Sequence, residues 1–299
     1  MPGAVGVQFP LTPAVRKNDD GTMGKANKRL CAALCALVLA CSGSCIAFGK
    51  KLSAGCEIYA LQYGASTYAA RSVYADDRSD ELVEFTWLVY LIKLDGRLVL
   101  VDTGFNDPRL LKRFKIRDFT DPIDLLKELD IGPEQVTDLI ITHTHFDHVQ
   151  LAHRFTGARI HMQARDYRYI EMNEDVPSFG PMCAYLKKNG RQLSLLSGNE
   201  ALCDDIELRL TGGHTYGSQV AVLSTRLKTY YFIGDESYLL EGVRRGRGNA
   251  LYDSRERNLE IIREMQEKLG DPSNEVLPMH DPEIMKRFPH VTRNIVKIL

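Results

Sequence analysis

The segment of this chain best suited to chemistry is short and rich in histidine. It reads Ile141-Thr142-His143-Thr144-His145-Phe146-Asp147-His148 and ends an apolar run, residues 136–142. The 299-residue chain holds only eight histidines, so three within six positions beside an aspartate are not expected by chance. Neutral imidazole and carboxylate are the ligands that zinc and similar divalent metals prefer. A strand that ends in such a cluster delivers several ligands to one point, and the segment therefore predicts a metal site.

Three further residues of ligand type share this context, because each follows an apolar strand. They are His214, Asp235 and His280. Two glycines precede His214 and allow a sharp backbone turn beside a bulky ligand. The remaining histidines lack such a context, and we expect surface or packing roles for them: His153, His161 and His290.

The candidate ligands are all of nitrogen or oxygen type, with no cysteine among them. Such a set fits two zinc ions, without excluding iron, manganese or cobalt. Two dications bridged by a carboxylate can lower the pKa of a shared water until it is hydroxide at neutral pH. The pattern therefore predicts metal-assisted hydrolysis, with two divalent metal ions as cofactors.

The elements that must position these ligands are strands alternating with helices. Strand-like runs cover residues 57–62, 83–94, 97–101, 136–142, 159–162, 206–211, 219–224, 229–233 and 276–278. Asp95-Gly96 is a two-residue hairpin signal, and Asp121-Pro122 begins a helix with an N-cap followed by proline. A second helix is expected over residues 255–269, and loops over 174–191 and 241–254. The mixed order predicts two sheets covered by helices.

Composition limits the class of partner. A hydrophobic content of 44% is enough for one sizeable core, and 299 residues suit one large domain. The net charge is −1 and the pI is about 6.7, so no basic excess favours binding to nucleic acid.

The first 55 residues differ from the rest, and we expect them to be a disordered N-terminus ahead of a domain at 56–299. Met23, a basic stretch and an apolar run over residues 30–40 look like a secretory signal within residues 23–45. Val38-Leu39-Ala40-Cys41 resembles the lipobox of bacterial lipoproteins, which predicts export and membrane anchoring through a lipidated Cys41. A buried N-terminal helix in a cytoplasmic protein is the alternative. Either Met1 or Met23 could be the true start.

The ordered motifs together resemble the metallo-β-lactamase superfamily. The resemblance rests on Asp102 in Val-Asp-Thr-Gly, on the His-x-His-x-Asp-His cluster, and on His214, Asp235 and His280 in that order. It implies an α/β (α+β) fold, the αββα four-layer sandwich, with a binuclear metal site at one edge.

The resemblance also assigns roles position by position. His143, His145 and His214 would hold one metal; Asp147, His148 and His280 would hold the other; Asp235 would bridge them. Asp102 would orient a ligand rather than bind metal. Histidine at position 145 argues against the diiron oxidoreductase branch, which usually has glutamate there.

One local motif points to a reaction. Asp235-Glu236-Ser237-Tyr238 is similar to the Asp-x-x-Tyr of N-acyl homoserine lactonases. This implies that a metal-bridging hydroxide opens a lactone ring, with Tyr238 stabilising the oxyanion and Asp147 passing the proton to the leaving oxygen. The chain departs from that group at Val149-Gln150-Leu151, where Gln150 is expected near the mouth of the site and leaves the acyl preference open.

Two other functions stay open at this point. A thioester hydrolase of the glyoxalase II type has nearly the same ligands, and the basic run Arg244-Arg245-Gly246-Arg247 could imitate its glutathione-binding region. The other alternative is a non-catalytic metal-binding surface lipoprotein, although binding alone would not need seven ligands. The sequence does not determine the physiological lactone, the metal in the cell or the oligomeric state.

Overall fold

The computed structural model describes residues 55–175 and 180–299. The chain divides into two units, Met1–Gly49 and Lys50–Leu299, and the described residues belong to the second. The signal-like segment at 23–45, with Cys41, lies outside the described residues. Within the part that is described, no helix is both long and apolar enough to cross a membrane. Three cysteines there are free thiols, namely Cys56, Cys183 and Cys203.

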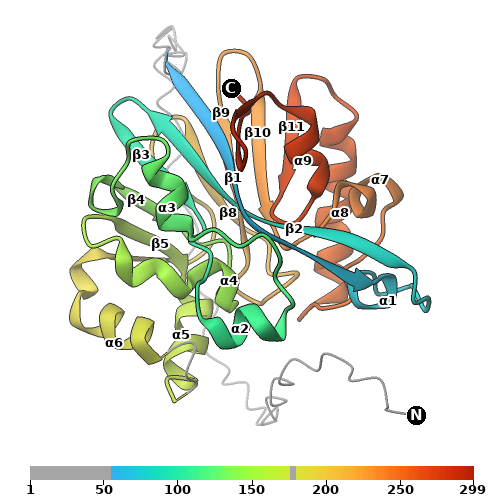
Figure 1. The fold of residues 1–299 in the computed structure, drawn as a ribbon, viewed down its shortest axis with the longest axis horizontal. Coiled ribbons are helices and arrows are strands. Elements are labelled where there is room, and N and C mark those ends of the chain that lie inside the picture. Colours follow the sequence, from blue (N-terminus) through green and yellow to red (C-terminus); the bar gives the residue numbers. More distant parts are fainter. Residues whose placement is uncertain (1–54, 176–179) are drawn as a thin grey trace, which may run out of the picture. The chain divides into compact units, whose positions relative to one another are not determined.

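Two sheets form the centre of the domain (Figure 1). The first has the order β12-β13-β1-β2-β3-β4-β5-β6 and the second β11-β10-β9-β8-β7. The strands of the first are β1 (Cys56–Ala69), β2 (Leu82–Leu94), β3 (Arg97–Val101), β4 (Asp138–Ile140), β5 (Arg159–Gln163), β6 (Leu193–Leu196), β12 (His290–Thr292) and β13 (Ile295–Lys297). The strands of the second are β7 (Glu200–Ala201), β8 (Ile206–Leu210), β9 (Gln219–Ser224), β10 (Thr229–Gly234) and β11 (Asn274–Pro278).

Strand direction decides where the strand ends meet. β3, β4, β5 and β6 run parallel, and so do β10 and β11. The carboxyl ends of neighbouring parallel strands lie at one edge of a sheet. Loops that follow β4, β10 and β11 can therefore converge.

Helices flank the two sheets (Figure 1). They are α1 (Ala70–Val73), α2 (Pro108–Arg113), α3 (Pro122–Lys127), α4 (Phe146–Val149), α5 (Ala164–Met172), α6 (Gly180–Lys188), α7 (Leu240–Arg245), α8 (Arg255–Leu269) and α9 (Pro282–Arg287). Single 3₁₀ turns cover Pro133–Gln135, Gln150–Arg154 and Gly190–Gln192. In the view of Figure 1, α2, α3, α5 and α6 lie beside the first sheet and α7 and α8 beside the second. The four-layer αββα arrangement expected from the sequence is confirmed.

Three helices begin with the same short signal. Asp107, Asp121 and Asp281 each accept a hydrogen bond from a backbone N–H two residues ahead, and proline follows each aspartate. The carboxylate satisfies a donor that the first helical turn leaves free, and proline supplies the required φ at no cost in hydrogen bonds. This signal at Asp121 is the one that the sequence had indicated.

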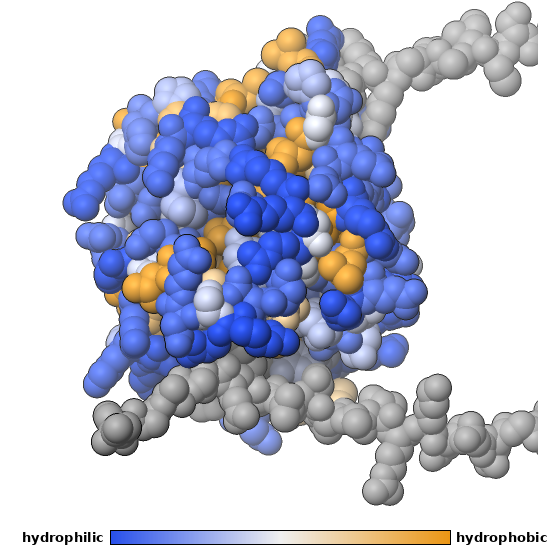
Figure 2. All heavy atoms as spheres, turned by 90° about the vertical axis from the view of Figure 1, so that its right-hand side faces the viewer, coloured by the Kyte–Doolittle hydropathy of each residue, from blue (hydrophilic) through white to orange (hydrophobic). Residues whose placement is uncertain are grey.

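One apolar core fills the space between the sheets. It draws on the inner faces of β1, β2 and β3 from one sheet and of β8, β9 and β10 from the other, with Met265 and Ile284 from the covering helices. Burying each large apolar side chain contributes roughly 1.5–3 kcal/mol. The outer surface on the helical side of the second sheet is mainly hydrophilic, with scattered apolar spots (Figure 2). The helices therefore present their apolar sides inward.

Two expectations about loops are wrong. Residues 174–191 contain α6, and residues 241–254 contain most of α7. α7 has no side-chain cap, and Leu240 and Val243 hold it by packing in the core before Gly246 ends it with a φ of 63°. A helix this short shows no sequence period, because tertiary packing rather than propensity forms it.

Candidate metal centre

Four loops bring the predicted ligands together, and each loop follows a strand. Residues 143–148 follow β4 and include α4, which carries Asp147 and His148. His214 lies between β8 and β9, Asp235 directly after β10, and His280 two residues after β11. All seven side chains meet at this edge of the two sheets in two overlapping groups. One group is His143, His145, His214 and Asp235; the other is Asp147, His148, Asp235 and His280.

The first group is a compact set of three imidazoles. His145 Nδ1 lies 2.9 Å from His143 Nε2 and 3.0 Å from His214 Nε2. The ligand atoms of each group lie within 4.8 Å of one another, which suits coordination of a single ion.

The second group joins the first through Asp235. Asp147 Oδ2 lies 3.2 Å from His148 Nε2 and 3.5 Å from His280 Nε2. Asp235 Oδ2 lies 3.4 Å from His148 Nε2 and 3.5 Å from His214 Nε2. Its Oδ1 lies 3.1 Å from His280 Nε2. Asp235 therefore faces both groups, as a bridging ligand must.

Hydrogen bonds outside the centre fix three of the rings. The Nδ1 of His214 donates to Leu251 O, and that of His280 donates to Thr86 O, each over 3.0 Å. The Nδ1 of His148 lies 2.8 Å from Asp102 Oδ2. With Nδ1 engaged in this way, each Nε2 points its lone pair into the centre, the orientation that ligating histidines usually have.

Asp102 holds two parts of the centre at once. Besides His148, its carboxylate accepts hydrogen bonds from the backbone N–H of Thr142 over 2.7 Å and from the Thr142 hydroxyl over 2.8 Å. It is fully buried and adopts a φ of 61°, a left-handed conformation that is uncommon outside glycine. Its carboxylate thus fixes the loop at the end of β4 as well as the ring of His148.

Two buried atoms in the centre have no hydrogen-bond partner. Every other buried side-chain nitrogen or oxygen in the described ranges has one. The two atoms are His148 Nε2 and Asp235 Oδ1. Such atoms are rare in folded proteins because a buried lone pair without a donor costs free energy. Here lone pairs of imidazole face carboxylate oxygens, so a cation between them would satisfy both. The residues present therefore fit a divalent metal.

The pKa values of the ligands follow from burial and close charges. Burial and the neighbouring histidines lower the pKa of His143 well below its usual range, and burial brings that of His145 to about 3. Both rings stay neutral at pH 7, as metal ligands must. Burial opposes ionisation of Asp235, yet the neighbouring His148 and His280 lower its pKa well below the usual range.

Two buried carboxylates that the sequence had not singled out hold the His214 loop from opposite sides. Glu236 accepts hydrogen bonds from the hydroxyls of Thr211 and Ser218, both over 2.6 Å, and from the N–H of His214 over 3.2 Å. Asn258 of α8 donates to the same carboxylate over 3.1 Å. No side chain larger than hydrogen fits at Gly213, because its Cβ would lie 2.8 Å from the backbone of Asn258.

Asp166 of α5 is the second of these carboxylates. It accepts hydrogen bonds from the N–H of Thr144 over 3.0 Å and from the hydroxyl of Thr215 over 3.1 Å. It thereby joins the loop that carries His143 and His145 to the loop that carries His214. Burial raises the pKa of Asp166 to about 6 against these hydrogen bonds. Asp166 is the third residue of α5, and nothing in the sequence there indicated this contact.

Gly234 sets the approach of the two sheets beside the centre. Its φ is 53°, and a Cβ there would lie 2.8 Å from both the Cβ and the hydroxyl of Thr142. Because Asp235 follows Gly234 and His143 follows Thr142, this contact places the ligands of β10 and β4 side by side.

Tyr238 packs against one histidine from each group. Its ring centroid is 5.8 Å from that of His214 and 5.7 Å from that of His280, and it packs edge-on against Phe85 at 5.5 Å. Burial, together with the charges of Asp235 and Asp147, raises the phenol pKa well above 10. The hydroxyl therefore stays protonated at neutral pH.

Gln150 forms hydrogen bonds with a neighbouring loop. Its side-chain oxygen accepts hydrogen bonds from the N–H of Asn106 over 3.0 Å and of Asp107 over 3.3 Å. The side chain is thus used to hold the loop that leads into α2.

Fold and ligand arrangement together define the class of an αββα hydrolase with clustered metal-binding groups. The model of the metallo-beta-lactamase superfamily matches residues 87–280, and the chain belongs to this family.

Curated relatives and solved structures extend the comparison. An N-acyl homoserine lactonase of a Bacillus species is 24% identical over 246 residues, covering 76% of this chain and 94% of the relative. One from Bacillus cereus is 23% identical with the same coverage. The structure of an N-acyl homoserine lactone hydrolase with its product at the catalytic metal centre has a TM-score of 0.64 at 19% identity, covering 79% of this chain and 97% of that one. A dizinc quorum-quenching lactonase has a TM-score of 0.60 at 18% identity, with 78% and 89% covered.

Proposed function

We propose that this protein opens a lactone ring, that of an N-acyl homoserine lactone or a similar ester, at a site that holds two divalent metals. The observation that carries the proposal is the position of Tyr238, a protonated phenol packed against His214 and His280 of the ligand cluster. The lactonases among the relatives support the choice of substrate class. The fold and the ligand set alone would suit other ester and thioester hydrolases.

Metals at this centre would supply a nucleophilic water of lowered pKa and Lewis acidity toward the carbonyl. We assign His143, His145 and His214 to one ion, Asp147, His148 and His280 to the other, and Asp235 to both. The nitrogen and oxygen ligands favour zinc.

Two side chains of this site would act on the substrate itself. Tyr238 would donate a hydrogen bond to the carbonyl oxygen as negative charge develops on it, and its raised pKa keeps that proton available. Asp147 is buried, yet His148 beside it keeps its pKa below the usual range. As a carboxylate, it can take up a proton and pass it to the oxygen that leaves the ring.

The thioester alternative shares the ligand set, but the basic run that could recognise glutathione is engaged in ion pairs. Arg244 pairs with Glu283 over 2.7 Å, Arg245 with Glu241 over 2.5 Å, and Arg247 with Asp76 over 2.9 Å. These arginines hold parts of the fold together and are already engaged. The basic run is therefore poorly placed to serve as a free glutathione-binding region.

A panel of substrates tests the proposal. The purified protein, loaded with zinc, is assayed for acid release from N-acyl homoserine lactones and for hydrolysis of a glutathione thioester, and its metal content is measured. We expect about two metals per chain and turnover of the lactone, both removed by chelation and restored by zinc. Thioester turnover without lactone turnover would refute the proposal. Bound metal without turnover of either substrate would favour the non-catalytic alternative.

Export and anchoring remain a separate proposal. It rests on the signal-like residues 23–45 and on Cys41 in the sequence. Fractionation of cells that express the full chain should place it in the membrane fraction, and Cys41→Ser should release it. Cytoplasmic protein with Met1 intact would refute this proposal.

A further inference from the structure

A second polar site lies at the other end of the strands that carry the metal ligands. Strand alternation puts Arg97 on the same face of β3 as the core residues Val99 and Val101, and Asp138 on the same face of β4 as Ile140. Arg159 and His161 alternate likewise on β5, next in the sheet. Inner positions of a sandwich are normally apolar, so a row of charged groups there departs from the pattern that folding alone favours.

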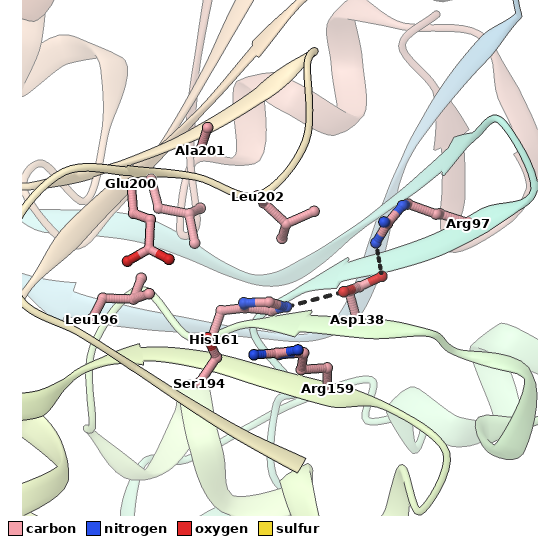
Figure 3. Close-up of a pocket in the computed structure, with 10 residues that line it drawn as sticks. Arg97, Asp138, Arg159, His161, Ser194, Leu196, Glu200, Ala201 and Leu202 are labelled. Atoms are coloured by element: carbon pink, nitrogen blue, oxygen red, sulfur yellow. Dashed lines mark hydrogen bonds and ion pairs between the residues drawn. The ribbon is translucent and has the colours of Figure 1, made fainter. Parts of the chain in front are cut away.

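These side chains line a cavity of about 240 Å³ (Figure 3). β7 and its flanking loop close the opposite wall with Glu200, Ala201 and Leu202. Asp138 precedes His143 by five residues, which spans at most about 16 Å in an extended chain. Asp138 is the first residue of β4, whereas His143 lies beyond its last residue, so the cavity and the metal ligands lie at opposite ends of this strand.

The innermost charge of the cavity is already neutralised. Asp138 is 3% exposed and accepts hydrogen bonds from the Thr137 hydroxyl over 2.8 Å, Arg97 over 3.0 Å and His161 Nε2 over 3.0 Å. His161 is 7% exposed, and since Nε2 is engaged with Asp138, Nδ1 is the ring nitrogen left for a ligand. Figure 3 shows that nitrogen on the side away from Asp138.

Two further charges line the same cavity without neutralising each other. Arg159 on β5 and Glu200 on β7 are exposed at its rim, and within the described residues neither forms an ion pair. They stand on facing walls in Figure 3. A simple anion would suit Arg159 but would face the carboxylate of Glu200, and a simple cation would have the reverse problem. A ligand with both charges complements both residues.

Apart from Ser194, the rest of the lining is aliphatic. Leu196 and Leu208 are buried core residues, and Leu202 packs against the core from β7's side. The apolar part of a ligand that carries both charges would therefore contact these leucine side chains.

We propose that this cavity binds a small aliphatic α-amino acid. The carboxylate pairs with the guanidinium of Arg159, the ammonium group with Glu200, and the side chain contacts Leu196, Leu202 and Leu208. His161 Nδ1 offers a further polar contact within the cavity. This site is independent of the reaction proposed for the metal centre.

Calorimetric titration of the full, metal-loaded chain with L-leucine tests the proposal. A ligand of about nine non-hydrogen atoms is expected to bind with a Kd of about 1 mM or tighter. Three probes each lack one feature: 4-methylpentanoate has no ammonium group, 3-methylbutylamine has no carboxylate, and glycine has no side chain. We expect each to bind at least about 10-fold more weakly than L-leucine.

Two variants test the assigned partners. Arg159→Gln and Glu200→Gln should each weaken L-leucine binding at least about 10-fold, because each leaves one ligand charge unpaired. Arg168→Gln, at another exposed position, is the control and should change nothing. Lactone turnover should be unchanged in all three variants, which separates this site from the metal centre.

Several results would overturn the proposal. Absence of saturable heat with L-leucine would do so, as would binding of 4-methylpentanoate at equal affinity, which would indicate an anion site only. Equal loss of binding in Arg168→Gln would show that Arg159 has no special part.

Discussion

The two ends of β4 both carry buried polar clusters, but their hydrogen bonds are arranged in opposite ways. At the start of the strand, Asp138 accepts from three donors and is satisfied. Beyond its end, His148 Nε2 and Asp235 Oδ1 have no donor although both are buried. A cluster that satisfies itself contributes to the stability of the fold, whereas one with unpaired buried atoms costs free energy that a bound cation would offset. Composition alone would not have separated the two.

Removal of the proposed bridging carboxylate should have the largest effect on turnover. Asp235→Asn removes the negative charge of the carboxylate that faces both groups and replaces one of its oxygens with an NH2 group. Lactone turnover should fall more than about 1,000-fold, with loss of at least one metal. Metal analysis and turnover measure this. Asp204→Asn, at an exposed aspartate, is the control. Full metal content in Asp235→Asn would contradict the bridging assignment.

Tyr238→Phe removes one donor and leaves the ligands in place. Turnover should fall about 10- to 1,000-fold, since one oxyanion donor is lost, while the metal content stays at the wild-type value. Tyr185→Phe removes a hydroxyl from α6, where it contacts Gln192, and serves as the matched control. If kcat in Tyr238→Phe equals that of the wild type, Tyr238 has no part in the reaction.

Glu236→Gln changes a residue that holds the loop of the ligand His214 but is not itself a candidate ligand. Glutamine keeps one acceptor oxygen and has an NH2 group in place of the other. Because the backbone N–H of His214 approaches both oxygens of Glu236, it meets a donor in either orientation of the amide, and the His214 loop should shift. Substitution of a residue that hydrogen-bonds to a metal ligand typically lowers the metal affinity 10- to 100-fold. Competition with a chelator should therefore show one weakened metal and one unchanged. Glu260→Gln, on the exposed side of α8, should leave both affinities unaltered.

Asp138→Asn tests the satisfied end and should have the smallest effect on catalysis. Losing the carboxylate leaves Arg97 unpaired, and the free energy of unfolding should fall by about 1–3 kcal/mol with metal content unchanged. Although burial opposes it, the hydrogen bond from His161 lowers the pKa of Asp138 below 3.8 in the folded state. Its stabilisation is present above about pH 4 and is lost as the pH falls through that lowered value. Denaturant unfolding at several pH values should show this loss in the wild type and not in the variant.

The sequence predicted most of the fold and all the residues that meet at the centre. His143, His214, Asp235 and His280 could be found because each is a ligand-type residue within four positions after an apolar strand. The Asp95-Gly96 hairpin and the Asp-Pro start of α3 were equally local signals.

The features that sequence reasoning missed depend on contacts between distant segments. Asp166 and Glu236 look like ordinary helix and loop acids, and only the folded chain shows which donors surround them. Asp138 and Arg97 were absorbed into apolar runs, because a single charge at the start of a strand resembles a solvated end. α7 was missed since core packing, not capping, determines it.

Gly234 has a further consequence for how such a centre can vary. A single methyl group at this position would have to occupy the space of Thr142, and so would push β10 away from β4. The separation between the two sheets at the centre thus depends on the lack of a Cβ atom at Gly234 rather than on any ligand. A lineage could exchange the candidate ligands one at a time and keep the spacing between their two groups, but a change from glycine to alanine here would alter that spacing in one step.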